Sequence, residues 1–138
     1  MIAVGPHAGK SLKILYIEDN DQNFYLVEFI LRAKGHEVRR ARDGMEGIDL
    51  ATSVKADLIL LDIQLPVMDG YATARELRKK PELANTPIIA LTSYAMTGDR
   101  EKALAAGCTG YIEKPINPKN FAAQIDHYME SPIRMENQ

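Results

Sequence analysis

Three acidic residues and one lysine stand where apolar stretches of this sequence end. Asp62 directly follows the run "LILL", although a carboxylate is among the least favourable groups in an apolar interior. Glu18 and Asp19 follow "LKILYI" in the same way, and Lys114 follows "TGYIE". A single acid at the end of a strand most often caps a turn where the chain meets water. A group of such acids indicates a site that needs carboxylates.

The chemistry of such a site follows from its charges. Carboxylates held together repel one another and need a cation, and oxygen ligands without His or Cys favour Mg²⁺. Mg²⁺ keeps coordination positions for waters and phosphate oxygens. An aspartate beside Mg²⁺ and a lysine can attack phosphorus, and the lysine offsets charge on the phosphoryl oxygens. We therefore assign the nucleophile to Asp62, with Lys114 and the hydroxyl of Thr92 facing the phosphoryl group.

The elements that must position these residues alternate between strands and helices. Such alternation predicts an α/β fold, a parallel sheet with helices on both faces and ligands at the carboxyl ends of the strands. Thr92 and Ser93 would then reach the same edge as the acids and Lys114. The expected strands are 12–17, 36–41, 58–61, 86–93 and 109–114, and the expected helices are 22–34, 44–54, 70–79, 98–106 and a last one with Pro118 in its first turn.

Local patterns predict further details of packing. Asp21 is expected to cap the first helix, and the arginine run at 39–42 is expected to be a solvated edge. His7, His36 and His127 show no ligand spacing and are expected at the surface. The apolar faces are predicted to consist of Leu26, Phe29, Ile30 and Ala33 in the first helix, and of Phe121, Ile125 and Tyr128 in the last.

Composition limits the class of protein. The chain has 138 residues, 46% hydrophobic and 26% charged, with a net charge of −2, which predicts one globular domain without a general attraction to nucleic acid or membranes. No signal peptide or membrane helix is apparent. A single cysteine, Cys108, is typical of a cytoplasmic protein, and its side chain is expected to be a small buried hydrophobic group. We expect a disordered segment at 1–11, a domain at 12–131 and a frayed tail at 132–138.

Taken together, the motifs resemble the receiver domain of response regulators over about residues 12–130. They are "EDN" at 18–20, "LLDIQLPVMDG" around Asp62, "ALTS" ending at Thr92–Ser93 and "GYIEKP" with Lys114. The resemblance implies a flavodoxin-like sheet of strand order 2-1-3-4-5 and a cis peptide before Pro115. It also implies that Mg²⁺ is bound by Glu18, Asp19, Asp62 and the backbone carbonyl of Gln64.

The resemblance further implies a phosphorelay function rather than enzymatic turnover. Asp62 would accept a phosphoryl group from a histidine kinase or a histidine phosphotransfer protein, and Lys114 would contact that group. Thr92 and Tyr111 would form a switch pair that alters the surface of helix 4, strand 5 and helix 5, where a downstream protein or a second phosphorylated copy would bind. From their places two residues past Asp62 and Thr92, Gln64 and Tyr94 are predicted to control the lifetime of the phosphoryl group.

Other interpretations are weighed against this one. A receiver cut from a hybrid histidine kinase has the same motifs as a single-domain regulator. "GPHAGKS" at 5–11 approaches the phosphate-binding loop of NTPases, but it is one residue short and precedes a strand. An aspartate-nucleophile phosphatase usually needs a second acid two residues after the nucleophile, where this chain has Gln64.

Overall fold

A single parallel sheet forms the centre of the molecule. The computed structural model describes residues 10–93 and 98–130, and its sheet has the order β2-β1-β3-β4-β5. This order confirms the predicted topology. The strands are β1 (Lys13–Ile17), β2 (Glu37–Ala41), β3 (Leu58–Asp62), β4 (Ile88–Thr92) and β5 (Gly110–Glu113).

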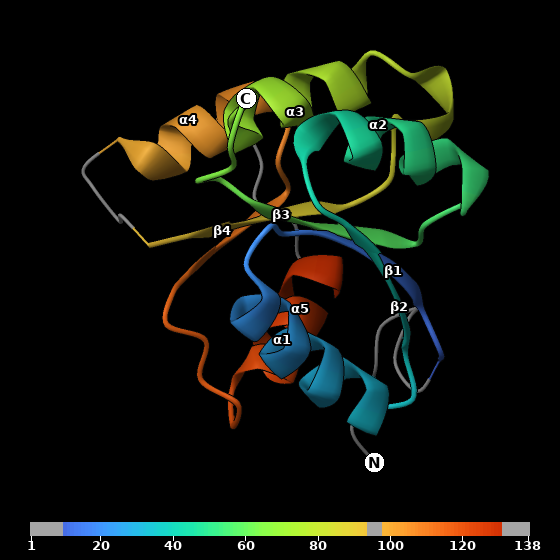
Figure 1. The fold of residues 1–138 in the computed structure, drawn as a ribbon, viewed down its shortest axis with the longest axis vertical. Helices are drawn as coiled ribbons and strands as arrows, with labels where there is room; N and C mark the ends of the chain where they lie inside the picture. The colour runs from blue at the N-terminus through green and yellow to red at the C-terminus, as the bar shows by residue number, and fades with distance from the viewer. Residues whose placement is uncertain (1–9, 94–97, 131–138) are drawn as a thin grey trace.

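Helices cover both faces of the sheet (Figure 1). One layer is formed by α1 (Asp21–Ala33) and α5 (Phe121–Glu130). The other layer contains α2 (Gly44–Ser53), α3 (Gly70–Arg78) and α4 (Asp99–Ala106), and a short 3₁₀ helix, Pro81–Leu83, follows α3. Two apolar cores result because successive strand residues point to opposite faces, as Leu15 and Tyr16 do. Cys108 is buried in the core beside α4, as predicted.

The register of the strands aligns the predicted site residues. Ile17 lies opposite Leu61, so the residues that follow them in the sequence, Glu18 and Asp62, lie at the same level of the sheet. Asp62 lies opposite Leu91, one residue before Thr92. The carboxyl ends of β1, β3 and β4 therefore meet at one edge of the sheet.

The first helix begins with a different cap from the one predicted. Asn20 is the N-cap, and its side chain accepts a hydrogen bond from the backbone N–H of Asn23 at 2.8 Å. Asp21 is instead the first helical residue and forms ion pairs with Arg40 and Arg42 at 2.9 and 3.1 Å. Both residues are common cap types, so their order along the sequence could not decide between them.

The apolar face predicted for α1 is wrong in most of its members. The helix buries Phe24, Val27, Ile30 and Leu31. Leu26 and Phe29 are 38% and 74% exposed, together with Tyr25 at 57%. The helix carries two overlapping apolar stripes, and stacking of Phe24 on Tyr16, with ring centroids 5.7 Å apart, accompanies the burial of one of them.

Arg40 and His36 are also less exposed than predicted. The Arg40 side chain is 12% exposed, lies 4.7 Å over the ring of Phe24 and donates to the backbone carbonyl of Glu18 at 3.1 Å. His36 is half-buried, and its Nδ1 accepts from the backbone N–H of Leu12 at 3.1 Å. His127 is exposed as predicted, whereas His7 lies outside the described residues.

The last helix starts three residues after Pro118 rather than around it. Pro118 lies in a turn in which the carbonyl of Asn117 accepts from the backbone N–H groups of Asn120 and Phe121. The buried face of α5 contains Met129, and Tyr128 is only half-buried because it lies at the margin of the core.

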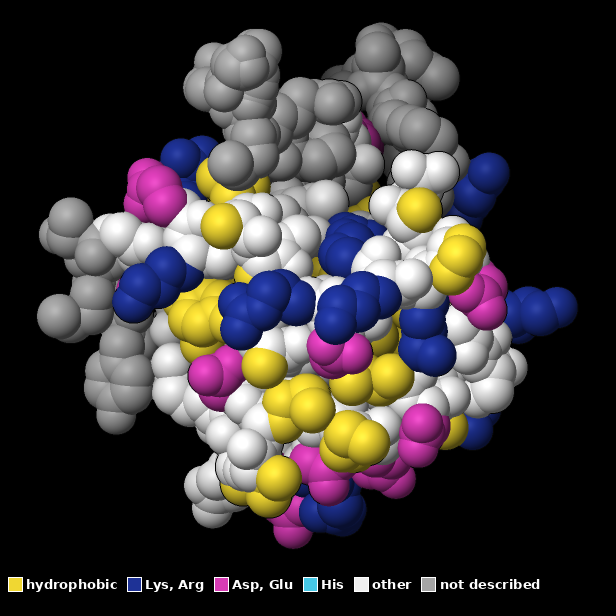
Figure 2. Space-filling view, turned by 90° about the horizontal axis from the view of Figure 1, so that it is seen from above, with side chains coloured by type: hydrophobic (Ala, Val, Ile, Leu, Met, Phe, Trp, Pro, Cys, Tyr) yellow, Lys and Arg dark blue, Asp and Glu magenta, His cyan; other side chains and the backbone are white. Residues whose placement is uncertain are grey.

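The surface formed by α2, α3 and α4 carries charges of both signs. Figure 2 shows a row of Lys and Arg side chains across this face, with acidic and hydrophobic side chains beside it. At the end of α3, Lys79 and Glu76 form an ion pair at 2.7 Å. Nearby acidic side chains therefore offset part of the positive charge of this row, which agrees with the small net charge of −2.

Candidate metal centre

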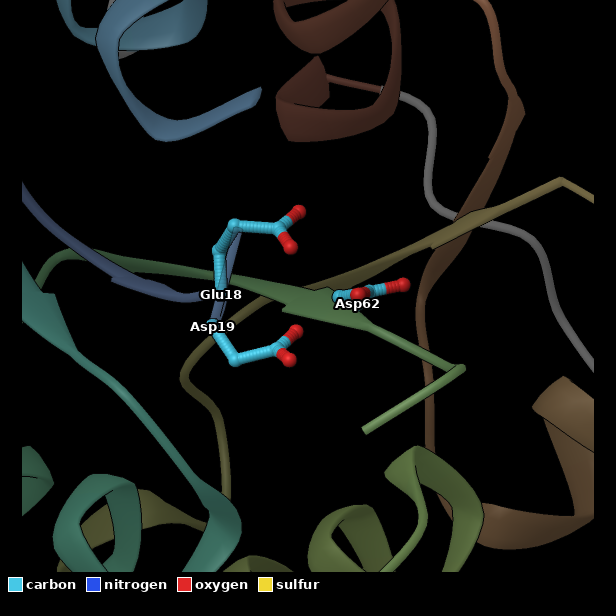
Figure 3. Close-up of side chains that lie close together, drawn as sticks. All are labelled: Glu18, Asp19 and Asp62. Atoms are coloured by element: carbon cyan, nitrogen blue, oxygen red, sulfur yellow. The ribbon is translucent and has the colours of Figure 1, made fainter. Parts of the chain in front are cut away.

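Three carboxylates meet at the carboxyl ends of β1 and β3. Glu18, Asp19 and Asp62 each offer an oxygen, and these oxygens all lie within 4.8 Å of one another. Figure 3 shows Glu18 and Asp19 on opposite sides of the chain, with their carboxylates turned toward the β3 side where Asp62 lies. Glu18 and Asp62 are buried, and Asp19 is exposed.

This cluster fits the chemistry of Mg²⁺. Its donors are oxygens only, which a hard cation prefers. Mg²⁺ binds oxygen at about 2.1 Å, so opposite ligands lie about 4.2 Å apart. The observed spread of up to 4.8 Å needs only a small closing movement of the side chains. Because Asp19 is exposed, the cluster is open to solvent on one side.

Glu18 is held by several hydrogen bonds inside the protein. Its Oε1 accepts from the hydroxyl of Tyr16 at 2.8 Å and from Lys114 Nζ at 3.2 Å, and its Oε2 accepts from the backbone N–H of Asn20 at 3.1 Å. Burial and then the Glu18 carboxylate raise the pKa of Tyr16 far above its usual range, so its hydroxyl remains a donor. The sequence interpretation missed Tyr16, although residues two apart on a strand share a face.

Lys114 lies between the two buried acids. Its Nζ is 3.2 Å from Glu18 Oε1 and 3.2 Å from Asp62 Oδ1, and its side chain is only 11% exposed. The peptide bond between Lys114 and Pro115 is cis, as the resemblance implied. A single ammonium group thus faces two carboxylates, which leaves the cluster with excess negative charge.

The surroundings of Asp62 oppose its ionisation. It is 3% exposed, and burial followed by the nearby Glu18 raises its pKa from 3.8 to about 6. Lys114 and the backbone N–H of Gln64, which donates to Asp62 Oδ1 at 3.1 Å, act in the opposite direction. The run Leu58–Leu61 is fully buried, so β3 carries Asp62 directly from the core to this edge.

The side chain of Gln64 connects the ends of β3 and β4. Its Nε2 donates to the hydroxyl oxygen of Thr92 at 3.1 Å, and its Oε1 accepts from the backbone N–H of Ser93 at 3.1 Å. Sequence reasoning did not anticipate this bridge. It connects the Thr92 hydroxyl, which is predicted to donate a hydrogen bond to the phosphoryl group, to a neighbouring side chain.

Two predicted site residues remain, Tyr111 and Tyr94. Tyr111 lies half-buried on β5 and packs against the core beneath α3 and α4, and its carbonyl accepts from the Tyr128 hydroxyl at 3.0 Å. Tyr94 lies outside the described residues. Asp69, which was not predicted to belong to the site, caps α3: its side chain accepts from the backbone N–H of Ala72 at 2.8 Å.

Comparison with known proteins decides the family. The response regulator receiver domain matches residues 14–126. The chain belongs to this family. The function is therefore that of a phosphoacceptor receiver in two-component signalling, and the acidic cluster is compatible with its Mg²⁺ site.

Relatives of this receiver include both regulators and parts of kinases. The polar-differentiation response regulator DivK of Brucella anthropi is 40% identical over 84% of this chain and 94% of the relative. The chemotaxis protein CheY4 of Vibrio cholerae superposes with a TM-score of 0.82 at 29% identity, covering 86% of this chain and 98% of that one. The receiver domain of the sensor histidine kinase PA1611 from Pseudomonas aeruginosa PAO1, solved with magnesium in its active-site cleft, has 37% identity and a TM-score of 0.79, covering 88% and 99%.

The helices give one further finding. No helix within the described residues is both long enough and apolar enough to cross a membrane.

Proposed function

We propose that Asp62 is the residue of this receiver that becomes phosphorylated. Mg²⁺ would be held by Glu18, Asp19, Asp62 and the backbone carbonyl of Gln64. The observation that carries this proposal is the convergence of a buried Asp62 with two further acids and Lys114. An Asp62 oxygen attacks the phosphorus of a phosphohistidine, the P–N bond breaks, and the histidine nitrogen keeps the electron pair. Bound Mg²⁺ supplies positive charge that offsets the acids and the phosphoryl oxygens.

Lys114 is suited to stabilise the same transfer. Its Nζ is already 3.2 Å from Asp62 Oδ1, so a small movement brings it to a phosphoryl oxygen on that carboxylate. The Thr92 hydroxyl would donate to another of these oxygens. The same hydroxyl oxygen accepts from Gln64 Nε2 at 3.1 Å, so a shift of Thr92 toward the phosphoryl group would lengthen or break that contact.

The direct test is phosphorylation by a small donor. The protein is incubated with acetyl phosphate or phosphoramidate and Mg²⁺, and phosphate uptake is followed by intact mass. We expect one phosphoryl group on the wild-type protein and none on Asp62→Asn, because an amide cannot attack phosphorus. Undiminished uptake by Asp62→Asn would show that another residue is the acceptor.

The output step follows from movement of Thr92. We infer that its shift toward the phosphoryl group vacates space for Tyr111, which alters the surface of α4, β5 and α5. Beryllofluoride, a phosphoryl mimic, should then change NMR chemical shifts in residues 94–128. Unchanged shifts there would contradict the switch. Sedimentation of the same samples tests whether two activated copies associate.

The phosphodonor is proposed to be a histidine kinase or a histidine phosphotransfer protein that contacts α1. This helix begins two residues after Asp19 and exposes Tyr25, Leu26 and Phe29. Phe29→Ala should slow phosphotransfer from such a protein but leave uptake from acetyl phosphate unchanged. Equal slowing with both donors would contradict a docking role for this face.

Two settings for the receiver have support. The 40% identity to DivK, of which the match covers 94%, favours a single-domain regulator. We propose that in this setting it acts in the cytoplasm and signals by binding a protein. The 37% identity to the receiver domain of a sensor histidine kinase favours a hybrid-kinase setting. The sequence of the full gene distinguishes them.

A further inference from the structure

The hydroxyl of Tyr16 contacts an acid that the proposed site needs. The side chain of Tyr16 is fully buried on β1, two residues before Glu18 and on the same face of the strand. Its hydroxyl donates to Glu18 Oε1 at 2.8 Å, the shortest of the three hydrogen bonds described for that carboxylate. A hydrophobic residue of similar shape would fill the core equally well but could not make this bond.

The Tyr16 ring is held in place by its neighbours. It stacks on Phe24 with centroids 5.7 Å apart and an interplanar angle of 25°. Phe24 in turn lies beneath the guanidinium of Arg40, 4.7 Å from the ring centroid. Arg40 also donates to the backbone carbonyl of Glu18 at 3.1 Å. Tyr16 and Arg40, at the two ends of this stack, therefore both form hydrogen bonds with Glu18.

The hydrogen bonds to Glu18 restrict which part of its carboxylate can face a cation. Each carboxylate oxygen has about two acceptor positions. Tyr16 and Lys114 use those of Oε1, and the Asn20 N–H uses one on Oε2. One position on Oε2 therefore has no donor among the described residues. This oxygen is the one available to Mg²⁺ or to a water bound to it.

We infer that Tyr16 is a positioning residue for the metal site: its hydroxyl orients the Glu18 carboxylate so that Oε2 faces the bound Mg²⁺. This inference rests on the proposed metal role of Glu18. Lys114 is shared between Glu18 and Asp62 at 3.2 Å from each. In the proposed function it turns toward the phosphoryl group when Asp62 is modified. Tyr16 then remains as the side-chain donor that keeps Glu18 in place.

The test is a double-mutant cycle on Mg²⁺ affinity, measured by titration of the unphosphorylated protein. Tyr16→Phe should weaken Mg²⁺ binding by about tenfold or more, as loss of an outer partner of a metal ligand typically does. In a Glu18→Gln background the same change should alter affinity less than about twofold, because the hydroxyl acts through that carboxylate. Tyr128→Phe is the matched control: it removes a hydroxyl that donates to the Tyr111 carbonyl at 3.0 Å, and Mg²⁺ affinity should not change.

The outcomes separate this inference from the proposed site. If Glu18→Gln leaves Mg²⁺ affinity unchanged, the proposed role of Glu18 fails. If Glu18→Gln weakens binding but Tyr16→Phe stays within about twofold of wild type, the site stands and only the role of Tyr16 is wrong. An equal effect of Tyr16→Phe in both backgrounds also overturns it.

A measurement on the wild-type protein removes any dependence on the folding of variants. The chain has 6 tyrosines, which can be labelled with ¹³C at Cζ and followed by NMR. The Tyr16 signal should shift with Mg²⁺ and saturate with the same affinity as the site, whereas the Tyr128 signal should not move. A Tyr16 signal that is insensitive to Mg²⁺ overturns the inference.

Discussion

Replacing Asp62 by asparagine should stabilise the metal-free protein at neutral pH, although it removes the proposed phosphoacceptor. Asp62 is buried beside Glu18, and these two causes raise its pKa from 3.8 to about 6. The folded protein therefore holds the proton on this carboxyl more tightly than the unfolded chain does. The stabilising contribution of that proton is present below pH 3.8 and is lost as pH rises through about 6.

The size of the effect follows from the same values. The interval between 3.8 and about 6 corresponds to about 3 kcal/mol at pH 7, at about 1.4 kcal/mol per pKa unit. Asparagine has nearly the shape of the protonated carboxyl and carries no charge, so Asp62→Asn should recover about 1–3 kcal/mol. The gain should shrink toward zero near pH 4, where the wild-type carboxyl is protonated.

Urea unfolding followed by circular dichroism at pH 7 and pH 4, in metal-free buffer, measures this difference. Mg²⁺ provides a second condition: at one hundred times its Kd it stabilises the wild-type protein by about 2.7 kcal/mol, which offsets most of the advantage of the variant. A variant that is less stable than wild type at pH 7 without Mg²⁺, or a gain that does not depend on pH, would refute the repulsion argument.

Three further predictions concern the metal, the lifetime of the signal and the fold. Asp19→Ala should weaken Mg²⁺ binding at least about tenfold by titration without lowering the metal-free unfolding free energy, because it removes an exposed acid from a repulsive cluster; a clear loss of stability would contradict this. Tyr94→Ala should speed loss of phosphate by opening the path of water, whereas Gln64→Ala also releases Thr92; if both rates stay within about twofold of wild type, with a tenfold change equal to about 1.4 kcal/mol, neither residue controls the lifetime. Arg78→Ala should cost about 2–4 kcal/mol in urea unfolding, because its guanidinium donates to the carbonyls of Leu83 and Thr86 at 2.6 Å and of Gly107 at 2.8 Å; a cost below about 1 kcal/mol would mean that water replaces it.

The elements of the fold were largely readable from the sequence. Apolar runs of strand length alternate with segments of helical period, and this order allows few topologies once crossovers are right-handed. Because parallel strands end at one edge, the order of the motifs also predicted that Glu18, Asp62 and Lys114 would meet. The structure agrees with that prediction, because one carboxylate oxygen of Glu18 and one of Asp62 each lie 3.2 Å from Lys114 Nζ.

The tertiary structure decided which of several equivalent local patterns is used. In α1 two apolar stripes overlap, and only packing against Tyr16 and the sheet selects Phe24 for burial and leaves Phe29 exposed. Arg40 is polar in any sequence scale, yet it is covered because α1 brings Phe24 and Asp21 to it.

The contacts that complete the site depend on register and on side-chain conformation. The sequence places Gln64 two residues after Asp62, but its bridge to Thr92 exists only because β3 and β4 are adjacent with Asp62 opposite Leu91. Tyr16 and Glu18 could be assigned to one face of β1 from their spacing alone. That their oxygen atoms lie 2.8 Å apart, and that Lys114 from a distant part of the chain reaches the same Glu18 oxygen at 3.2 Å, is decided only by the folded structure.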